Sequence, residues 1–224
     1  FPDTPLPKGT FVGMPLRTQI TDLADSSDAD RAGRCARARA DLGLDTDRPT
    51  LLVSGGSQGA VAINDAVVAA RDTLLADGVQ ILHVVGPKNI KGNTKIVDET
   101  TGAAWLPVGY VDDMASAYAA ADLMVARSGA GTVVETATVG LPTIYVPLPH
   151  GNGEQARNAT SAVDAGAGVV VTNAELDAQR LLAETARIHD ADALARMSAA
   201  GRGLMPAHAA EEMAARVISA TNSK

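Results

Sequence analysis

Cysteine, long apolar runs and positive charge are all in short supply in this 224-residue sequence. The single cysteine, Cys35, excludes an internal disulfide and fits a reducing compartment, so we expect a cytoplasmic protein. No stretch approaches the roughly 20 apolar residues that span a bilayer, and the N-terminus lacks the charged and apolar regions of a signal peptide. The sequence therefore predicts a soluble chain.

The shortage of positive charge bears on the possible partners. The chain has 19 Lys and Arg against 26 Asp and Glu, a net charge of -7 and a pI near 5.0. Phosphate backbones are held by clustered Lys and Arg, which the sequence does not show, so nucleic acid is not an expected partner. Cys35 lies on a polar, alanine-rich helical segment, and we interpret it as an incidental side chain rather than as a nucleophile.

The apolar content, in contrast, is ample. At 46% of 224 residues it can bury one sizeable core but hardly two. We expect one domain over residues 21–224, preceded by an interdomain segment over residues 1–20. The sequence starts at Phe1 rather than at Met, which indicates a piece of a longer protein.

Short apolar runs rich in Val, Ile and Leu alternate with longer alanine-rich segments of helical period. This alternation is typical of an α/β fold, in which an open, parallel, Rossmann-like sheet carries helices on both faces. The predicted strands are residues 50–54, 80–85, 105–108, 123–126, 143–146 and 168–171. The predicted helices are residues 28–42, 113–121, 131–139, 154–165 and 174–220, with breaks in the last near Asp190 and residues 201–206, and one more helix whose inner face carries Ile63, Val67 and Leu74. Residues 88–101 are predicted to be a polar surface loop.

A glycine-rich turn, GGSQGA at residues 55–60, joins the first predicted strand to the helix that follows. Open α/β sheets place ligands at such turns. Glycine lets backbone N–H groups approach an anion, and the helix N-terminus adds about half a positive charge, so a pyrophosphate fits there. The alternative is a tight turn in which the glycines only relieve backbone strain, and the motif alone does not decide between the two.

Two common phosphate ligands are disfavoured. A dinucleotide site needs the spacing G-x-G-x-x-G and an acidic residue at the end of the second strand, which here ends in Val85 and Gly86. A P-loop needs Gly-Lys-Ser/Thr after a four-residue gap, and that is absent too. Nicotinamide and ATP chemistry therefore rank low.

Two further polar turns are expected at the same edge of the sheet. The first, RSGAGT at residues 127–132, opens a helix that carries Glu135, whose carboxylate can accept two hydrogen bonds from a ribose diol; a solvent-facing glutamate is the alternative. The second contains Gln155 and Asn158, which share a helix face and can present amides to sugar hydroxyls. We interpret His150 as a loop or supporting histidine, and His83, inside a strand, as a core histidine with its hydrogen bonds satisfied.

Five segments together carry a family resemblance. They are GMPLR at 13–17, GGSQGA at 55–60, YVDDM at 110–114, RSGA at 127–130 with Glu135, and QARNA at 155–159. In order and spacing they resemble the MurG family of peptidoglycan N-acetylglucosaminyltransferases, over residues 11–171 and more loosely beyond. The resemblance implies the C-terminal half of a GT-B fold, two Rossmann-like domains facing a cleft, of which this half binds UDP-N-acetylglucosamine.

The resemblance also implies roles for particular residues. Ser57, the adjacent backbone at Gln58, and Arg17 would meet the diphosphate, and the backbone of Ala130, Gly131 and Thr132 would face the diphosphate or the sugar. Tyr110, the Val111 backbone and Met114 would border the uracil, Glu135 would take the ribose hydroxyls, and Gln155 and Asn158 would read the sugar. No metal or cofactor is expected, and Asp113 is predicted to cap the next helix rather than to bind a metal.

In the full enzyme the implied reaction moves N-acetylglucosamine, with inversion, to a lipid-linked muramoyl-pentapeptide at the cytoplasmic face of the membrane, in the synthesis of peptidoglycan on which cell shape and division depend. The family's N-terminal domain, with its histidine near the acceptor, has no counterpart here, so we expect no complete catalysis and assign no catalytic residue. Another GT-B glycosyltransferase, a UDP-sugar epimerase and a non-catalytic nucleotide-sugar-binding module remain alternatives.

Overall fold

The computed structural model describes residues 9–56, 59–150 and 152–222 of the chain. These residues form a seven-stranded sheet in the order β3-β4-β2-β1-β5-β6-β7. All neighbouring strands are parallel except β3 and β4. The parallel strands are β1 (Thr50–Ser54), β2 (Gln80–Val84), β4 (Ala104–Val108), β5 (Leu123–Ala126), β6 (Thr143–Tyr145) and β7 (Gly168–Val170). The predicted α/β class is confirmed, and each predicted strand is present to within a residue at either end.

The sequence does not predict β3 (Ile96–Val97), which lies within the stretch expected to be a surface loop. It pairs antiparallel with the outer edge of β4, Ile96 opposite Trp105. Both residues of β3 are exposed. Two exposed residues show no alternation between apolar and polar, so the sequence carries no strand signal here.

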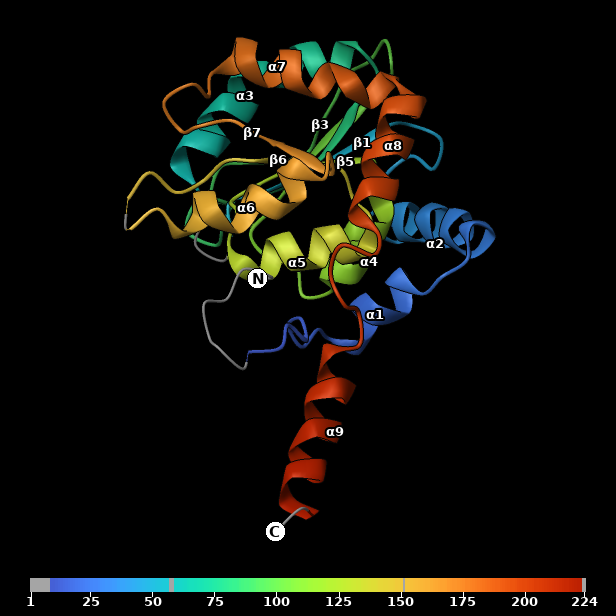
Figure 1. Cartoon of the computed structure of the whole chain (residues 1–224). Helices are drawn as coiled ribbons and strands as arrows, with labels where there is room; N and C mark the ends of the chain where they lie inside the picture. Colours follow the sequence, from blue (N-terminus) through green and yellow to red (C-terminus); the bar gives the residue numbers. More distant parts are fainter. Residues whose placement is uncertain (1–8, 57–58, 151, 223–224) are drawn as a thin grey trace.

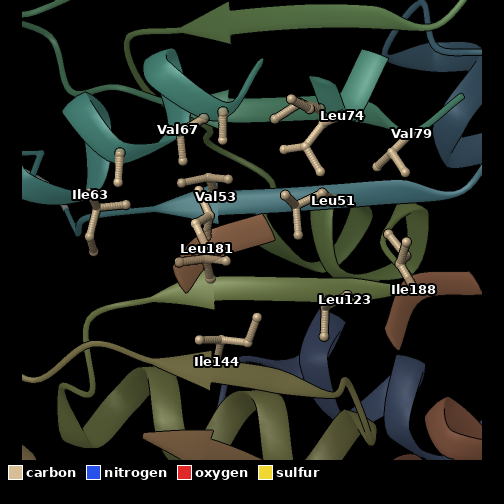
Figure 2. Close-up of a cluster of buried hydrophobic side chains, with 14 of the residues drawn as sticks. Leu51, Val53, Ile63, Val67, Leu74, Val79, Leu123, Ile144, Leu181 and Ile188 are labelled. Atoms are coloured by element: carbon tan, nitrogen blue, oxygen red, sulfur yellow. The ribbon is translucent and has the colours of Figure 1, made fainter. Parts of the chain in front are cut away.

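Alternate residues of the parallel strands pack in two apolar cores on opposite faces of the sheet, because successive side chains of a strand point to opposite faces. Leu51 and Val53 point to the face that α3 and α7 cover, where they meet Val67 and Leu181 (Figure 2). Leu52 points to the opposite face and packs in the core to which α1 and α4 contribute. The helices on both faces therefore exclude water from the parallel strands.

Except for the first, which the sequence did not predict, the helices agree with the predicted segments in place and approximate length. They are α1 (Thr18–Ala24), α2 (Asp28–Asp41), α3 (Val61–Ala76), α4 (Met114–Ala120), α5 (Ala130–Val139), α6 (Glu154–Asp164), α7 (Ala178–Thr185), the 3-10 helix η1 (Ala186–His189), α8 (Ala191–Gly201) and α9 (Ala209–Asn222). The breaks predicted near Asp190 and residues 201–206 are both present, and Asp190 caps α8. In Figure 1, α3 and α7 lie on one side of the sheet and α2, α4 and α5 on the other.

The two ends of the described chain behave differently. Helix α1 crosses the predicted limit at residue 20, and its Ile20 and Leu23 are buried in the core beneath α4. Helix α9 instead extends away from the body, with Val217 and Ile218 exposed (Figure 1). None of the helices in the described ranges has the length and apolar character needed to cross a bilayer.

Candidate functional site

The strand order fixes where a ligand can bind. From β1 the chain moves outward through β2 to β4, and then returns to β5 on the other side of β1 and continues through β6 to β7. At such a switch point the connections leave on opposite faces, and a crevice opens beyond the carboxyl ends of the two central strands. The turns after β1 and β5 lie there, and they are the two glycine-containing turns singled out in the sequence.

The turn after β1 requires its glycines. Gly56 and Gly59 have positive φ angles of 86° and 76°. A Cβ on Gly59 would lie 2.3 Å from the carbonyl oxygen of Val85, so the turn packs directly on the end of β2. Helix α3 then begins after Ala60. The methyl side chain of Ala60 cannot accept a hydrogen bond, so it does not cap the first N–H groups of the helix. Ser57 and Gln58 lie outside the described residues.

The turn after β5 has the same character. Gly129 precedes α5 and provides no side-chain cap. Ala130, Gly131 and Thr132 form the first turn of the helix and are partly exposed. A second helix N-terminus without a side-chain cap therefore lies at the switch point.

Glu135 lies on the same partly exposed side of α5, with 17% of its side chain accessible. Its Oε2 accepts a hydrogen bond from the Tyr118 hydroxyl of α4 at 2.7 Å. Its Oε1 lies 3.4 Å from Nη2 of Arg17, the residue that precedes α1. The sequence predicted Glu135 and Arg17 as ligands of different parts of one nucleotide, and the structure brings them together as an ion pair.

The residues predicted to border uracil follow β4. Asp113 caps α4 by accepting from the Ser116 N–H at 3.2 Å, as predicted, and hydrogen bonds to Ser116 lower the pKa of this carboxyl. Met114 and Arg17 line one cavity of about 300 Å³ between α1 and the start of α4. Tyr110 is 60% exposed and Val111 is partly exposed at the same edge of the sheet.

The loop after β6 is held against the turn after β5 by side chains of α6 and by Arg127 of the turn itself. Asn158 Nδ2 donates to the Ser128 carbonyl oxygen at 3.1 Å, and Gln155 Oε1 accepts from the Leu148 N–H at 3.0 Å. Arg127 donates to the carbonyl oxygens of Val146 and Pro147, both at 3.0 Å. Gln155 and Asn158 thus lie at the loop after β6 and the turn after β5, and these two bonds leave Gln155 Nε2 and Asn158 Oδ1 unused. His150, in the same loop, is exposed.

His83 is a core histidine, as predicted. It is fully buried in β2, its Nδ1 accepts the indole N–H of Trp105 at 3.2 Å, and its Nε2 lies 3.1 Å from Asn64 Oδ1. Burial lowers its pKa to about 4, so the ring is neutral at pH 7. Asn64 Nδ2 in turn donates to the Val85 carbonyl oxygen at 3.0 Å, the atom on which the glycine-rich turn packs.

A second cavity, of about 320 Å³, lies away from this crevice. Its lining includes Cys35 and residues just before β5 and β6, Asp122 and Pro142, so it opens at the amino ends of the strands. Burial raises the pKa of the Cys35 thiol, which disfavours the reactive thiolate.

Tyr118 is the site residue that the sequence reasoning missed. It is the large polar side chain in an otherwise small-residue helix, MASAYAA. A buried tyrosine hydroxyl normally finds a hydrogen-bond partner, so a tyrosine in such a helix next to the predicted site is the signal that was available.

Residues 50–216 match the glycosyltransferase family 28 C-terminal domain. A curated UDP-N-acetylglucosamine--N-acetylmuramyl-(pentapeptide) pyrophosphoryl-undecaprenol N-acetylglucosamine transferase of Cutibacterium acnes is 86% identical over 223 residues, which are 100% of this chain and 60% of that protein. The protein of the same name from a Nocardioides species is 48% identical over 219 residues, 97% of this chain and 58% of that protein. The chain thus spans about 60% of the length of these relatives.

Solved structures give the same picture. The crystal structure of Acinetobacter baumannii MurG matches with a TM-score of 0.61 and 28% identity, over 73% of this chain and 48% of that one. A kitacinnamycin glycotransferase matches with a TM-score of 0.59 and 21% identity, over 76% of this chain and 42% of that one, which supports the fold alone.

Proposed function

The chain belongs to the glycosyltransferase family 28 C-terminal domain family, and from this premise we propose that it binds UDP-N-acetylglucosamine as the donor part of an inverting glycosyltransferase. The proposed reaction transfers N-acetylglucosamine to the C4 hydroxyl of a lipid-linked muramoyl-pentapeptide in peptidoglycan synthesis. The names of the curated relatives support this assignment. Because the chain spans only about 60% of the length of those relatives, we assign acceptor binding to the remaining part of the longer protein.

One observation carries the proposal: two helices without side-chain caps begin at the switch point, and an acidic side chain lies beside the second. The N-termini of α3 and α5, whose capping residues Ala60 and Gly129 form no side-chain cap, offer N–H groups and positive dipole ends to a diphosphate. Glu135 lies about one turn beyond the α5 N-terminus, within reach of a nucleotide whose phosphates rest there. A carboxylate in this place suits the two hydroxyls of a ribose.

The other predicted site residues are assigned to the parts of the nucleotide sugar as follows. Arg17, Ser57 and the adjacent backbone at Gln58 are assigned to the diphosphate, as are the N–H groups of residues 130–132. Tyr110, Val111 and Met114, beside α4, are assigned to the uracil. Gln155 and Asn158 are assigned to the sugar hydroxyls, since each keeps one amide atom that is not used in the hydrogen bonds to the loop and the turn.

In this mechanism the chain acts on the leaving group. As the bond between the anomeric carbon and the phosphate oxygen breaks, negative charge grows on UDP, and fixed N–H dipoles stabilise it without reorganisation. Main-chain N–H groups serve this purpose, so the proposal requires no metal ion. The base that takes the acceptor proton is assigned to the part of the longer protein that binds the acceptor.

A lipid-linked acceptor implies that the full enzyme works at a membrane surface, and we place it at the cytoplasmic face, where the nucleotide sugar is available. The partners under this proposal are UDP-N-acetylglucosamine, the acceptor-binding region and, through that region, the lipid-linked acceptor.

Calorimetric titration of the chain with UDP-N-acetylglucosamine, UDP, ADP and NAD, without added metal, tests the proposal. Binding of the two uridine ligands in preference to ADP and NAD is the expected result. Preference for an adenine ligand, or no binding of any, would count against it. A panel of other UDP- and dTDP-sugars then separates N-acetylglucosamine transfer from the chemistry of other GT-B enzymes.

A further inference from the structure

The carboxylate of Glu135 is held from two sides, and the two contacts are unequal. The Tyr118 hydroxyl donates to Oε2 at 2.7 Å from a side chain that is 4% exposed. Arg17 approaches Oε1 at 3.4 Å from a side chain that is 54% exposed. An exposed ion pair of that length contributes little, whereas a short hydrogen bond to a charged acceptor inside the protein is among the stronger kind. Tyr118 is therefore the main constraint on Glu135.

We propose that Tyr118 is a positioning residue for nucleotide binding, which fixes the Glu135 carboxylate so that its remaining lone pairs face the ribose hydroxyls of the donor. The inference rests on the proposed function and goes beyond it, because Tyr118 itself is not expected to touch the nucleotide.

Helix packing supports this role. Tyr118 belongs to α4 and Glu135 to α5, and the Tyr118 ring is packed in the core beneath α4 with Met124 and Leu141. The ring therefore has no freedom to follow Glu135; instead, Glu135 must come to the hydroxyl. A glutamate on a helix surface samples many rotamers, and a single strong contact at one oxygen removes most of that freedom before the ligand arrives.

The chemistry leaves room for both partners. An ionised carboxylate has about four acceptor positions, so Oε2 can hold the Tyr118 hydroxyl while the carboxylate accepts from a ribose diol. Burial and the negative charge of Glu135 raise the pKa of Tyr118 far above its usual value, so the phenol keeps its proton and remains a donor.

A purely structural role for Tyr118 predicts something different. Loss of the hydroxyl would then lower the stability of the fold and weaken all ligands of the crevice alike. A positioning role acts only on the part of the ligand that Glu135 meets. The two are separated by a ligand that has the same phosphates and base but no ribose hydroxyls.

The experiment is calorimetric titration of the wild-type chain and the Tyr118→Phe variant with UDP and with 2′,3′-dideoxy-UDP. We expect the variant to bind UDP roughly five- to tenfold more weakly, and to bind the dideoxy ligand as the wild type does. Tyr145→Phe is the matched control, since Tyr145 is also buried and its hydroxyl pairs with Thr136 Oγ1 at 2.8 Å. It should leave the affinity for both ligands unchanged.

A double-variant cycle closes the test. In a Glu135→Ala background, Tyr118→Phe should cause no further loss of UDP affinity; a further loss would overturn the inference, because Tyr118 would then act on the ligand by another route. Equal weakening of UDP and dideoxy-UDP by Tyr118→Phe, or no weakening of UDP, also overturns it while leaving the proposed function intact. Failure of the wild-type chain to bind UDP overturns the proposed function, and the role of Tyr118 with it.

Discussion

Acid should destabilise this fold through one buried side chain, His83. The indole nitrogen of Trp105 can only donate a hydrogen bond, and it donates to Nδ1 of His83. The neutral ring therefore carries its hydrogen on Nε2, which donates a hydrogen bond to Asn64 Oδ1. Protonation would place a second hydrogen on Nδ1, opposite the indole N–H, in a fully buried position. Desolvation accordingly lowers the pKa of His83 from 6.5 to about 4.

The direction of the effect follows from which state binds the proton first. Because the folded-state pKa lies below the unfolded-state value, the unfolded chain takes up a proton before the folded chain as the pH falls. The stabilisation is therefore complete above a pH of about 6.5 and is lost as the pH falls from there to about 4. A pKa difference of this size corresponds to about 3 kcal/mol of the free energy of unfolding.

Urea unfolding measured between about pH 7 and pH 4 checks this. The reference is His83→Gln, whose side chain forms hydrogen bonds but does not titrate. The wild type should lose about 3 kcal/mol more than the variant over this interval. His150→Gln, in an exposed loop, is the control and should follow the wild type. Parallel stability curves for the wild type and His83→Gln would refute the reasoning.

Three further changes have expected outcomes. Glu135→Ala should weaken UDP binding several-fold in calorimetry, since a sugar diol would lose a charged acceptor, and unchanged affinity would contradict the ribose assignment. Gly59→Ala should lower the free energy of unfolding by more than about 1 kcal/mol, because its Cβ would lie 2.3 Å from the Val85 oxygen. Gly56→Ala, also at positive φ but with open space around it, should cost less, and equal melting temperatures would sink the packing argument. Arg39→Met should cost about 3 kcal/mol or more in urea unfolding, because the buried guanidinium pairs with Asp122 at 2.7 Å, and a cost under 1 kcal/mol would contradict this.

Much of the fold could be predicted because its strands are buried on both faces. Runs such as TLLVS in β1 and LMVA in β5 are continuous and apolar, and their limits match the structure. Helix α1 was not predicted, because seven residues with a mixed pattern give little periodicity and its burial comes from the core beneath α4, far along the chain. The edge strand β3 could not be predicted for a similar reason. Its pairing with β4, and not the pattern of its two residues, makes it a strand.

The site could be predicted less fully than the fold. The turns after β1 and β5 carry a local signal, since glycines follow an apolar strand and open a helix. The partnership of Tyr118 with Glu135 carries none, because it depends on how α4 and α5 sit against one another. The ion pair of Arg17 with Glu135 joins residues 118 positions apart and could not be read from spacing. Sequence motifs thus predicted which residues bind the nucleotide. The contacts that hold these side chains in place, such as those of Glu135 with Tyr118 and Arg17, could be found only in the structure.

The distribution of helix caps carries the functional argument one step further. The side chains that cap helices elsewhere in the described chain are Ser27, Asp113, Asp177 and Asp190, whereas α1 and α6, like α3 and α5, have no side-chain cap. At α3 and α5 the capping position is Ala60 or Gly129, which leaves the helix N–H groups to a ligand. Relative to a capping side chain, this costs about 1 kcal/mol of stability at Ala60 and roughly a few tenths of a kcal/mol at Gly129. Gly129 has φ -62° and ψ 149°, and a Cβ added to it would meet no atom within 4 Å, so aspartate fits there without strain.

Gly129→Asp should therefore raise the free energy of unfolding by roughly 0.5 to 1 kcal/mol, since the new carboxylate caps α5 and interacts favourably with the helix dipole. It should weaken UDP binding at least tenfold, because the same carboxylate occupies the N–H groups and repels the diphosphate. Asp190→Ala, at the start of α8, is the reverse control: it should lower stability by about 1 kcal/mol and leave UDP affinity unchanged. A Gly129→Asp variant that is more stable and binds UDP as the wild type does would show that the α5 N-terminus is uncapped for a reason other than the nucleotide.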